Sequence, residues 1–294
     1  MNFFLQLIVS GAMLGAVYSL IALGFVIITK SSGVVNFAQG QLVAVGALIL
    51  WALSVALGIP LWLGGLLSIG CCALLGAIIE YLTIRPMTGQ PIVSVIVMTL
   101  GIATLLDSLM AALFGTVERS LPATFPTGGL LIRGISIAYE YLLSFIIAAV
   151  MVGFFLYFFQ YTRLGLNMRA VADGHDKARS CGVKVGAIFR LSWAISAVSA
   201  MVGGFLLGNI ESVSINLSGI ALRVFPVIVL GGIDSMRGCI VAGPIVGILE
   251  ILAAGYVDPI TQGGAGDVMA SVIIVCTLVF RPYGIFGQEQ IERI

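Results

Sequence analysis

The chain has 294 residues, of which 60% are hydrophobic and only 9% are charged, and its mean hydropathy is +1.16. A soluble globular protein carries about 25% charged residues, so this composition excludes a soluble fold and predicts an integral membrane protein embedded in the lipid bilayer. The net charge of +1 argues against nucleic acid as a partner.

Apolar runs follow one another along the chain, and a helix needs about 20 such residues to cross a bilayer. The runs cover residues 4–28, 37–57, 61–84, 92–114, 139–159, 188–208, 220–233, 240–256 and 268–280. The run at 220–233 contains Arg223 and Pro226 and is only about 14 residues long, which is too short for a clean crossing. It either spans the membrane or forms a re-entrant half-helix. We therefore expect a single all-α transmembrane domain over residues 1–294, a polytopic bundle of eight or nine segments with short broken or re-entrant helices.

The first run has no Lys or Arg before Lys30 and no small-residue cleavage site after a short apolar core. It is therefore expected to be an uncleaved first span rather than a signal peptide. Gly11, Gly15 and Ser19 lie four residues apart on one face of this span. Such a stripe of small residues permits close contact with another helix.

The longest polar passage runs from Arg163 to Arg190 and holds six of the 14 Lys and Arg residues, opposed only by Asp173 and Asp176. Membrane proteins keep short loops rich in Lys and Arg in the cytoplasm. This rule predicts an external N-terminus, an internal C-terminus and a cytoplasmic loop over about residues 162–188, which we call the arm.

Within the arm, residues Met168 to Cys181 are predicted to form one short helix, with Gly182 as its stop signal. Two interpretations remain open. In the first, the small side chains of Ala170 and Ala178 let this helix dock in a groove on a soluble partner. In the second, the arm is a basic loop held at the lipid headgroups.

Charges within a bilayer are costly and usually face a cavity or a partner, and four fall within or beside the apolar runs: Glu80, Asp107, Arg223 and Glu250. Arg85 lies about one turn from Glu80, so we expect a structural ion pair or snorkelling there. Asp107 either lines a polar path or is a neutral, hydrogen-bonded acid in the core. Arg223 either attracts a solute carboxylate or pairs with Glu211 or Glu250, and the cost of an unpaired buried charge favours the pairing.

Two apolar runs interrupted by glycine, residues 31–46 and 219–247, lie one in each half of the chain. Broken helices near the membrane midplane expose backbone groups and often form transport sites. In the first run, Asn36 and Gln39 offer neutral hydrogen bonds to a passing solute. The alternatives are that Asn36 caps the second helix and that Gln39 packs inside it.

Motifs of the HExxH, GxSxG and GxxxxGK[ST] types are absent from the sequence, and His175 stands in the arm with no nucleophile beside it. We therefore expect neither catalysis nor a cofactor or metal in this chain. If ATP drives transport, the nucleotide must bind another chain.

Several short motifs occur in a fixed order along the chain. They are Asn36-Phe37-Ala38-Gln39-Gly40, then Glu80 with Arg85-Pro86, then Gly165, Arg169-Ala170, Ala178 and Gly182, then Leu230-Gly231-Gly232-Ile233 with Gly238 and Gly243, and finally Pro282-Tyr283-Gly284-Ile285-Phe286-Gly287. Together they resemble the LivH-type permease subunits of bacterial ATP-driven importers for branched-chain amino acids. Gln41 stands where many members of that family carry Glu, and Asp107 stands where a neutral polar residue is expected. Urea, short amides and aromatic carboxylates therefore stay open as solutes beside branched-chain amino acids.

The resemblance implies a permease in the bacterial inner membrane, paired with a second, LivM-like permease subunit. Two cytoplasmic ATPase subunits, which would hold ATP and Mg, and a periplasmic solute-binding protein complete the expected assembly. We place Asn36, Phe37, Gln39, Asp107 and Arg223 along the solute path. The residues expected to couple the arm to the ATPases are Gly165, Arg169, Ala170, Asp173, Ala178 and Gly182.

A function of another class also remains open: an ion-coupled secondary transporter or channel that acts alone and is driven by protonation of Asp107 or Glu250.

Overall fold

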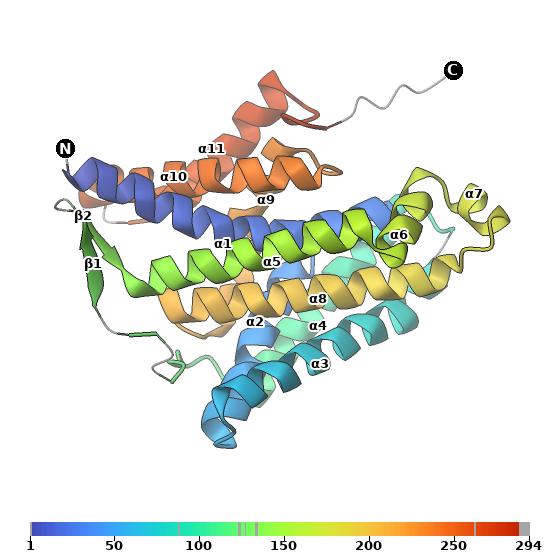
Figure 1. Ribbon diagram of the computed structural model, residues 1–294, viewed down its shortest axis with the longest axis horizontal. Coiled ribbons are helices and arrows are strands. Elements are labelled where there is room, and N and C mark those ends of the chain that lie inside the picture. The colour runs from blue at the N-terminus through green and yellow to red at the C-terminus, as the bar shows by residue number, and fades with distance from the viewer. Residues whose placement is uncertain are drawn as a thin grey trace.

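A computed structural model describes residues 2–87, 89–122, 125–126, 128–132, 135–261 and 263–287, and these residues form a helical bundle (Figure 1). The α-helices are α1 Asn2–Ser32, α2 Gln39–Trp51, α3 Leu61–Ile79, α4 Ile92–Phe114, α5 Tyr139–Tyr161, α6 Arg163–Asp173, α7 His175–Ser180, α8 Val185–Ile210, α9 Ile220–Gly231, α10 Met236–Thr261 and α11 Ala265–Phe280. The shorter elements are the π-helices η1 Ala52–Ala56 and η2 Glu80–Ile84, the 3₁₀-helices η3 Arg85–Met87 and η4 Ile215–Gly219, and the antiparallel strands β1 Gly129–Ile132 and β2 Ile135–Ala138.

Among the described residues, seven helical segments are long and apolar enough to cross a membrane, and α11 and the η4–α9 segment are shorter apolar helices. The predicted all-α polytopic fold is therefore confirmed. Helix α9 has 12 residues, which at 1.5 Å per residue gives a length of about 18 Å. Because the hydrocarbon core of a bilayer is about 30 Å thick, α9 alone is too short to cross it, which agrees with the half-helix alternative for the run at 220–233.

Several basic residues gather at one end of the bundle, which we call the basic end. Lys30, Arg169 and Arg237 line one cavity there, and Arg85 and Arg190 lie over the same aromatic ring. In Figure 1 this end, with α6 and α7, lies on the right, whereas the N-terminus and the β1–β2 hairpin lie on the left, at what we call the distal end. By the positive-inside rule we expect the basic end to face the cytoplasm.

Helix α1 is the central helix of the bundle, and most of its residues are buried. Its main partner is α10. A Cβ atom on Gly11 would stand 2.6 Å from the Cα atom of Ile248, and a Cβ atom on Gly15 would collide with the carbonyl oxygen of Gly243. Ser19 donates its hydroxyl to the carbonyl oxygen of Cys239 at 3.1 Å. The stripe of small residues predicted on the first span therefore does make a close helix contact, and its partner is α10.

Replacing Gly15 with valine is expected to push α1 away from α10, because overpacking a close contact costs about 1–3 kcal/mol or more. We expect a lower melting temperature for the detergent-purified protein. Gly153→Val on α5 is the matched control, because no other group lies within 4 Å of the added Cβ atom. Equal melting temperatures for the two variants would contradict the close α1–α10 contact.

Candidate functional site

The arm consists of two helices, α6 and α7, and not of the single helix over Met168–Cys181 that the sequence predicted. Helix α6 begins earlier than predicted, at Arg163, and ends at Asp173, and α7 follows after Gly174. The early start has a local cause: the Thr162 side chain accepts a hydrogen bond from the backbone N–H of Gly165 at 3.0 Å and so caps α6.

Gly182 does end the second helix, as predicted. The N–H of Val183 donates to the carbonyl of Ala178 at 3.0 Å, and the N–H of Gly182 donates to the carbonyl of Arg179 at 2.9 Å. This pair of bonds is a Schellman motif, which requires the left-handed backbone that Gly182 adopts at φ +82°.

The small residues of the arm face the protein's own bundle. Ala178 is only 3% exposed and packs in a cluster with Ile27, Phe159 and Phe189, against which Ala170 also packs. A Cβ atom on Gly165 would collide with the carbonyl oxygen of Phe159. These residues therefore hold the arm on the bundle, and the charged side chains of α6 and α7 are left for a partner.

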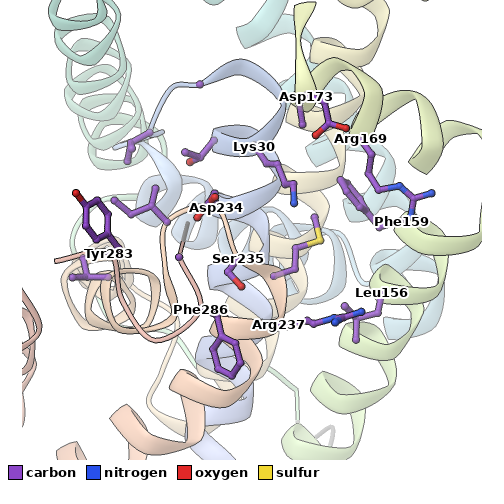
Figure 2. A pocket seen from close by; sticks show the side chains of 18 of the residues that line it. Lys30, Leu156, Phe159, Arg169, Asp173, Asp234, Ser235, Arg237, Tyr283 and Phe286 are labelled. Carbon is purple, nitrogen blue, oxygen red and sulfur yellow. The ribbon is translucent and has the colours of Figure 1, made fainter. Parts of the chain in front are cut away.

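A cavity of about 1140 Å³ lies between the arm and the chain segments that follow α9 and α11. Figure 2 shows Arg169 and Asp173 on the arm side, Tyr283 on the opposite side and Lys30 between them. Asp234 and Arg237, from the α9–α10 turn and the start of α10, complete the charged lining. Within the described parts of the chain, none of these five charged side chains forms an ion pair. We call this cavity the basic-end groove.

The wall of the groove opposite the arm joins two motifs that lie far apart in the sequence. The N–H of Ile285 donates to the carbonyl of Leu230 at 2.7 Å, and the N–H of Phe286 donates to the carbonyl of Gly231 at 3.2 Å. The C-terminal motif thus satisfies carbonyl groups that the end of a helix leaves without a partner. The contact is so close that a Cβ atom on Gly232 would stand 2.6 Å from the backbone nitrogen of Gly287.

The two apolar runs interrupted by glycine meet in the middle of the bundle. The ring of Phe37 stacks on that of Phe225 with centroids 5.9 Å apart, and a Cβ atom on Gly40 would stand 2.7 Å from the Cβ atom of Ala221. The start of α2 therefore packs directly against η4 and α9. The sequence showed that both runs are broken, but it carried no signal that they touch.

Asn36 and Gln39 are fully buried and belong to one hydrogen-bond network. The Asn36 side chain accepts from the N–H of Ala38 at 3.0 Å and donates to the Gln39 side chain at 3.2 Å. Gln39 also accepts from the Ser196 hydroxyl at 2.8 Å, across to α8. Asn36 thus orders the turn before α2 without being its N-cap residue, which is Ala38.

Asp107 lies on α4 and accepts a hydrogen bond at 3.1 Å from Gln41, which stands in the first turn of α2. It is thereby brought close to the junction of α2, η4 and α9. The sequence marks Gln41 and Asp107 as separate unusual positions, but it carries no signal that the two side chains form a hydrogen bond.

Arg223 lies near the distal end and is paired, as the cost of an unpaired charge predicted. Its guanidinium lies 3.0 Å from Glu211, 2.7 Å from Asp267 and 3.7 Å from Glu250. Glu250 is buried and also accepts a hydrogen bond from the Tyr18 hydroxyl at 3.1 Å. Arg223 therefore ties the start of α9 to α8, α10 and α11.

Glu80 pairs with a different residue from the one expected from spacing. Its carboxylate lies 3.6 Å from the Nε atom of Arg190 on α8, whereas Arg85 lies over the ring of Tyr81 at 5.4 Å. Sequence distance favoured Arg85, but the fully buried Glu80 side chain faces α8 and Arg85 is exposed.

His175 contacts the bundle rather than solvent alone. Its Nε2 atom lies 3.2 Å from the carbonyl oxygen of Ser31, and its ring meets the ring of Phe189 edge to face. The start of α7 is thereby held against the end of α1.

With the fold and the groove described, similarity to known proteins decides the family. Residues 7–279 match the family described as the permease component of branched-chain amino acid transport systems. The chain belongs to this family. The permease has full-length relatives: it is 28% identical to the high-affinity branched-chain amino acid permease protein LivH of Salmonella typhimurium, with 99% of this chain and 98% of the relative covered. It is equally identical, with the same coverage, to BraD of Pseudomonas aeruginosa, which has the corresponding description.

Among solved structures, the permease resembles PsaBC from Streptococcus pneumoniae in complex with Fab, with a TM-score of 0.50. The match covers 97% of this chain and 94% of the other at 14% identity. This likeness supports the fold alone.

Replacing Gly232 with alanine is expected to release the C-terminal motif from the end of α9, because the added methyl group would overlap the backbone of Gly287. A clash and backbone strain of about 1–3 kcal/mol correspond to amide hydrogen exchange of Ile285 and Phe286 that is about tenfold faster or more. Gly263→Ala is the matched control, since Gly263 also has a positive φ of +117° but no other group within 4 Å. Unchanged exchange in Gly232→Ala would show that the motif is held by other contacts.

Proposed function

We propose that this permease is the membrane subunit of an ATP-driven importer, which passes branched-chain or other hydrophobic amino acids from a periplasmic binding protein into the cytoplasm. It would work with a second, similar permease subunit of the LivM type and with two cytoplasmic ATPase subunits that bind the ATP and Mg. Its location would be the bacterial inner membrane.

The observation that carries the proposal is the match over nearly the whole chain to LivH and BraD, which are described as branched-chain amino acid permeases. The match spans the arm, the two broken helices and the C-terminal motif alike. The relatives' solute is therefore a reasonable first solute for this permease.

The basic-end groove supports coupling to a soluble motor. Lys30, Arg169 and Arg237 line it together with Asp173 and Asp234, so an ATPase domain with complementary charges could form ion pairs there. A push on the arm would reach α1 through the His175–Ser31 contact and through the cluster around Ala178. In this proposal the six coupling residues have two roles. Arg169 and Asp173 contact the ATPase, whereas Gly165, Ala170, Ala178 and Gly182 keep the arm in place.

The solute path is proposed to pass the junction of α2, η4 and α9, where Phe37 and Asp107 lie, with Arg223 nearer the distal mouth. Asn36 and Gln39 would shape the path by ordering the start of α2, since both are fully buried in their own network. Alternating access would then follow from movement of α9 relative to α2.

Reconstitution in liposomes tests the class of transporter. With the second permease, the ATPases and the binding protein present, we expect leucine uptake that requires ATP inside the liposome and binding protein outside. This chain alone should give no uptake above protein-free liposomes. Uptake by the chain alone, driven by a pH gradient and independent of ATP, would overturn the proposal in favour of an ion-coupled transporter.

Arg169→Glu tests the groove as the coupling site. The reversed charge would repel its partner on the ATPase, so we expect ATP-driven uptake to fall about tenfold or more while the protein still inserts and assembles. Lys184→Glu is the control, because Lys184 is an exposed basic residue of the arm that does not line the groove. Normal uptake by Arg169→Glu would show that the groove is not where the ATPase acts.

A further inference from the structure

The hydrogen bond between Gln41 and Asp107 leaves two acceptor atoms unused. The Nε2 atom of Gln41 donates to one carboxylate oxygen of Asp107 at 3.1 Å. The other carboxylate oxygen of Asp107 and the Oε1 atom of Gln41 are both shielded from solvent, and neither has a hydrogen-bond partner among the described residues. Buried polar atoms are nearly always paired in native proteins, so a pair of open acceptors is a place where a donor is missing.

Asp107 opens onto a cavity of about 580 Å³ between α4 and η4. The polar part of its lining consists of Asp107, Ser108, Thr116, Asn216 and Ser218. Asp107 is the one charged residue among the described residues that line it, so no lining cation balances the carboxylate. A site of this kind favours a ligand that carries positive charge and N–H donors, and it disfavours an anion.

The cavity also opens onto an exposed face of α4 that differs from the rest of that helix. Gly101, Thr104 and Ser108 follow one another at helical spacing on this exposed side, whereas other exposed positions of α4, such as Val97 and Leu113, are apolar. A strip of small and polar residues therefore continues from the cavity along α4, and its two hydroxyl groups donate to carbonyl groups of the same helix. At 1.5 Å per residue, Asp107 lies about 10 Å along α4 from its distal end.

We propose that Asp107 and Gln41 form a transient binding subsite for the protonated amino group of the transported amino acid. The carboxylate of Asp107, which lines the cavity, accepts hydrogen bonds from the ammonium group and balances its charge. Gln41, which does not line the cavity, holds the carboxylate in place through its own hydrogen bond. This inference rests on the proposed function and makes it more specific: the solute class is one with an ammonium group, which excludes aromatic carboxylates.

The charge preference of the cavity is tested by labelling Ser108→Cys in the reconstituted complex with methanethiosulfonate reagents, one cationic and one anionic. Modification is read by mass spectrometry of the peptide containing position 108, so the native cysteines stay in place. We expect the cationic reagent to react about tenfold faster, because a carboxylate in a cavity concentrates cations. In the double variant Ser108→Cys, Asp107→Asn the two rates should become similar. Equal rates in the presence of Asp107 would overturn the subsite.

Uptake measurements test the ammonium group itself. In the complete transporter we expect Asp107→Asn to lower the maximal rate of leucine uptake about tenfold, since an amide cannot balance the charge of the ammonium group. Asp107→Glu should restore much of the rate, and ATP hydrolysis by the assembled complex should continue in both variants. Glu118→Gln, which removes an exposed carboxylate that does not line the cavity, is the matched control and should transport normally.

The two proposals fail in distinguishable ways. If the unmodified complex imports leucine and Asp107→Asn imports it equally well, the subsite is wrong and the proposed function stands. If the unmodified complex imports no leucine or related amino acid, the proposed function fails, and the labelling rates still decide whether the cavity selects cations.

Discussion

The close contact between α1 and α10 is the constraint on which the rest of the structure depends. In a bilayer, apolar side chains gain little by leaving lipid for protein, so helices associate through close packing and hydrogen bonds. Gly11 and Gly15 provide the close packing, and Ser19 provides a hydrogen bond to the α10 backbone. This contact sets α1 in the centre of the bundle. The basic end of α1 contacts the arm, and the chain that follows α1 leads directly into the Asn36–Gly40 motif.

Much of this arrangement follows from local sequence signals. The stripe of Gly11, Gly15 and Ser19 and the stop at Gly182 are local patterns, and both appear in the structure as predicted. The short run around Pro226 forms the 12-residue helix α9, which agrees with one of its two predicted outcomes. The start of the first helix of the arm was harder to predict from the sequence, because the Thr162 cap starts α6 five residues before the predicted helix. Its side chain bonds the backbone of Gly165, an interaction that periodicity alone does not show.

The contacts that make the sites could not be predicted, because they join residues that are distant in the chain. Glu80 lies near Arg85 in sequence, yet its ion pair is with Arg190 on another helix. Asp107 and Gln41 were both visible as unusual positions, and their hydrogen bond spans 66 residues. The C-terminal motif was recognised by its glycines, but the reason for them appears only where Gly287 meets Gly232.

Together these contacts support one proposed mechanism. Movement that begins on a soluble ATPase enters at the basic-end groove and reaches the broken helices through α1 and α9. The most direct measurement is a structure of the complete transporter, with and without ATP. The account predicts an ATPase subunit against Arg169 and Asp173, and a shift of α9 relative to α2 when ATP binds. An ATPase that contacts other loops and leaves the groove open, or an arm on the side of the membrane away from the ATPase, would contradict it.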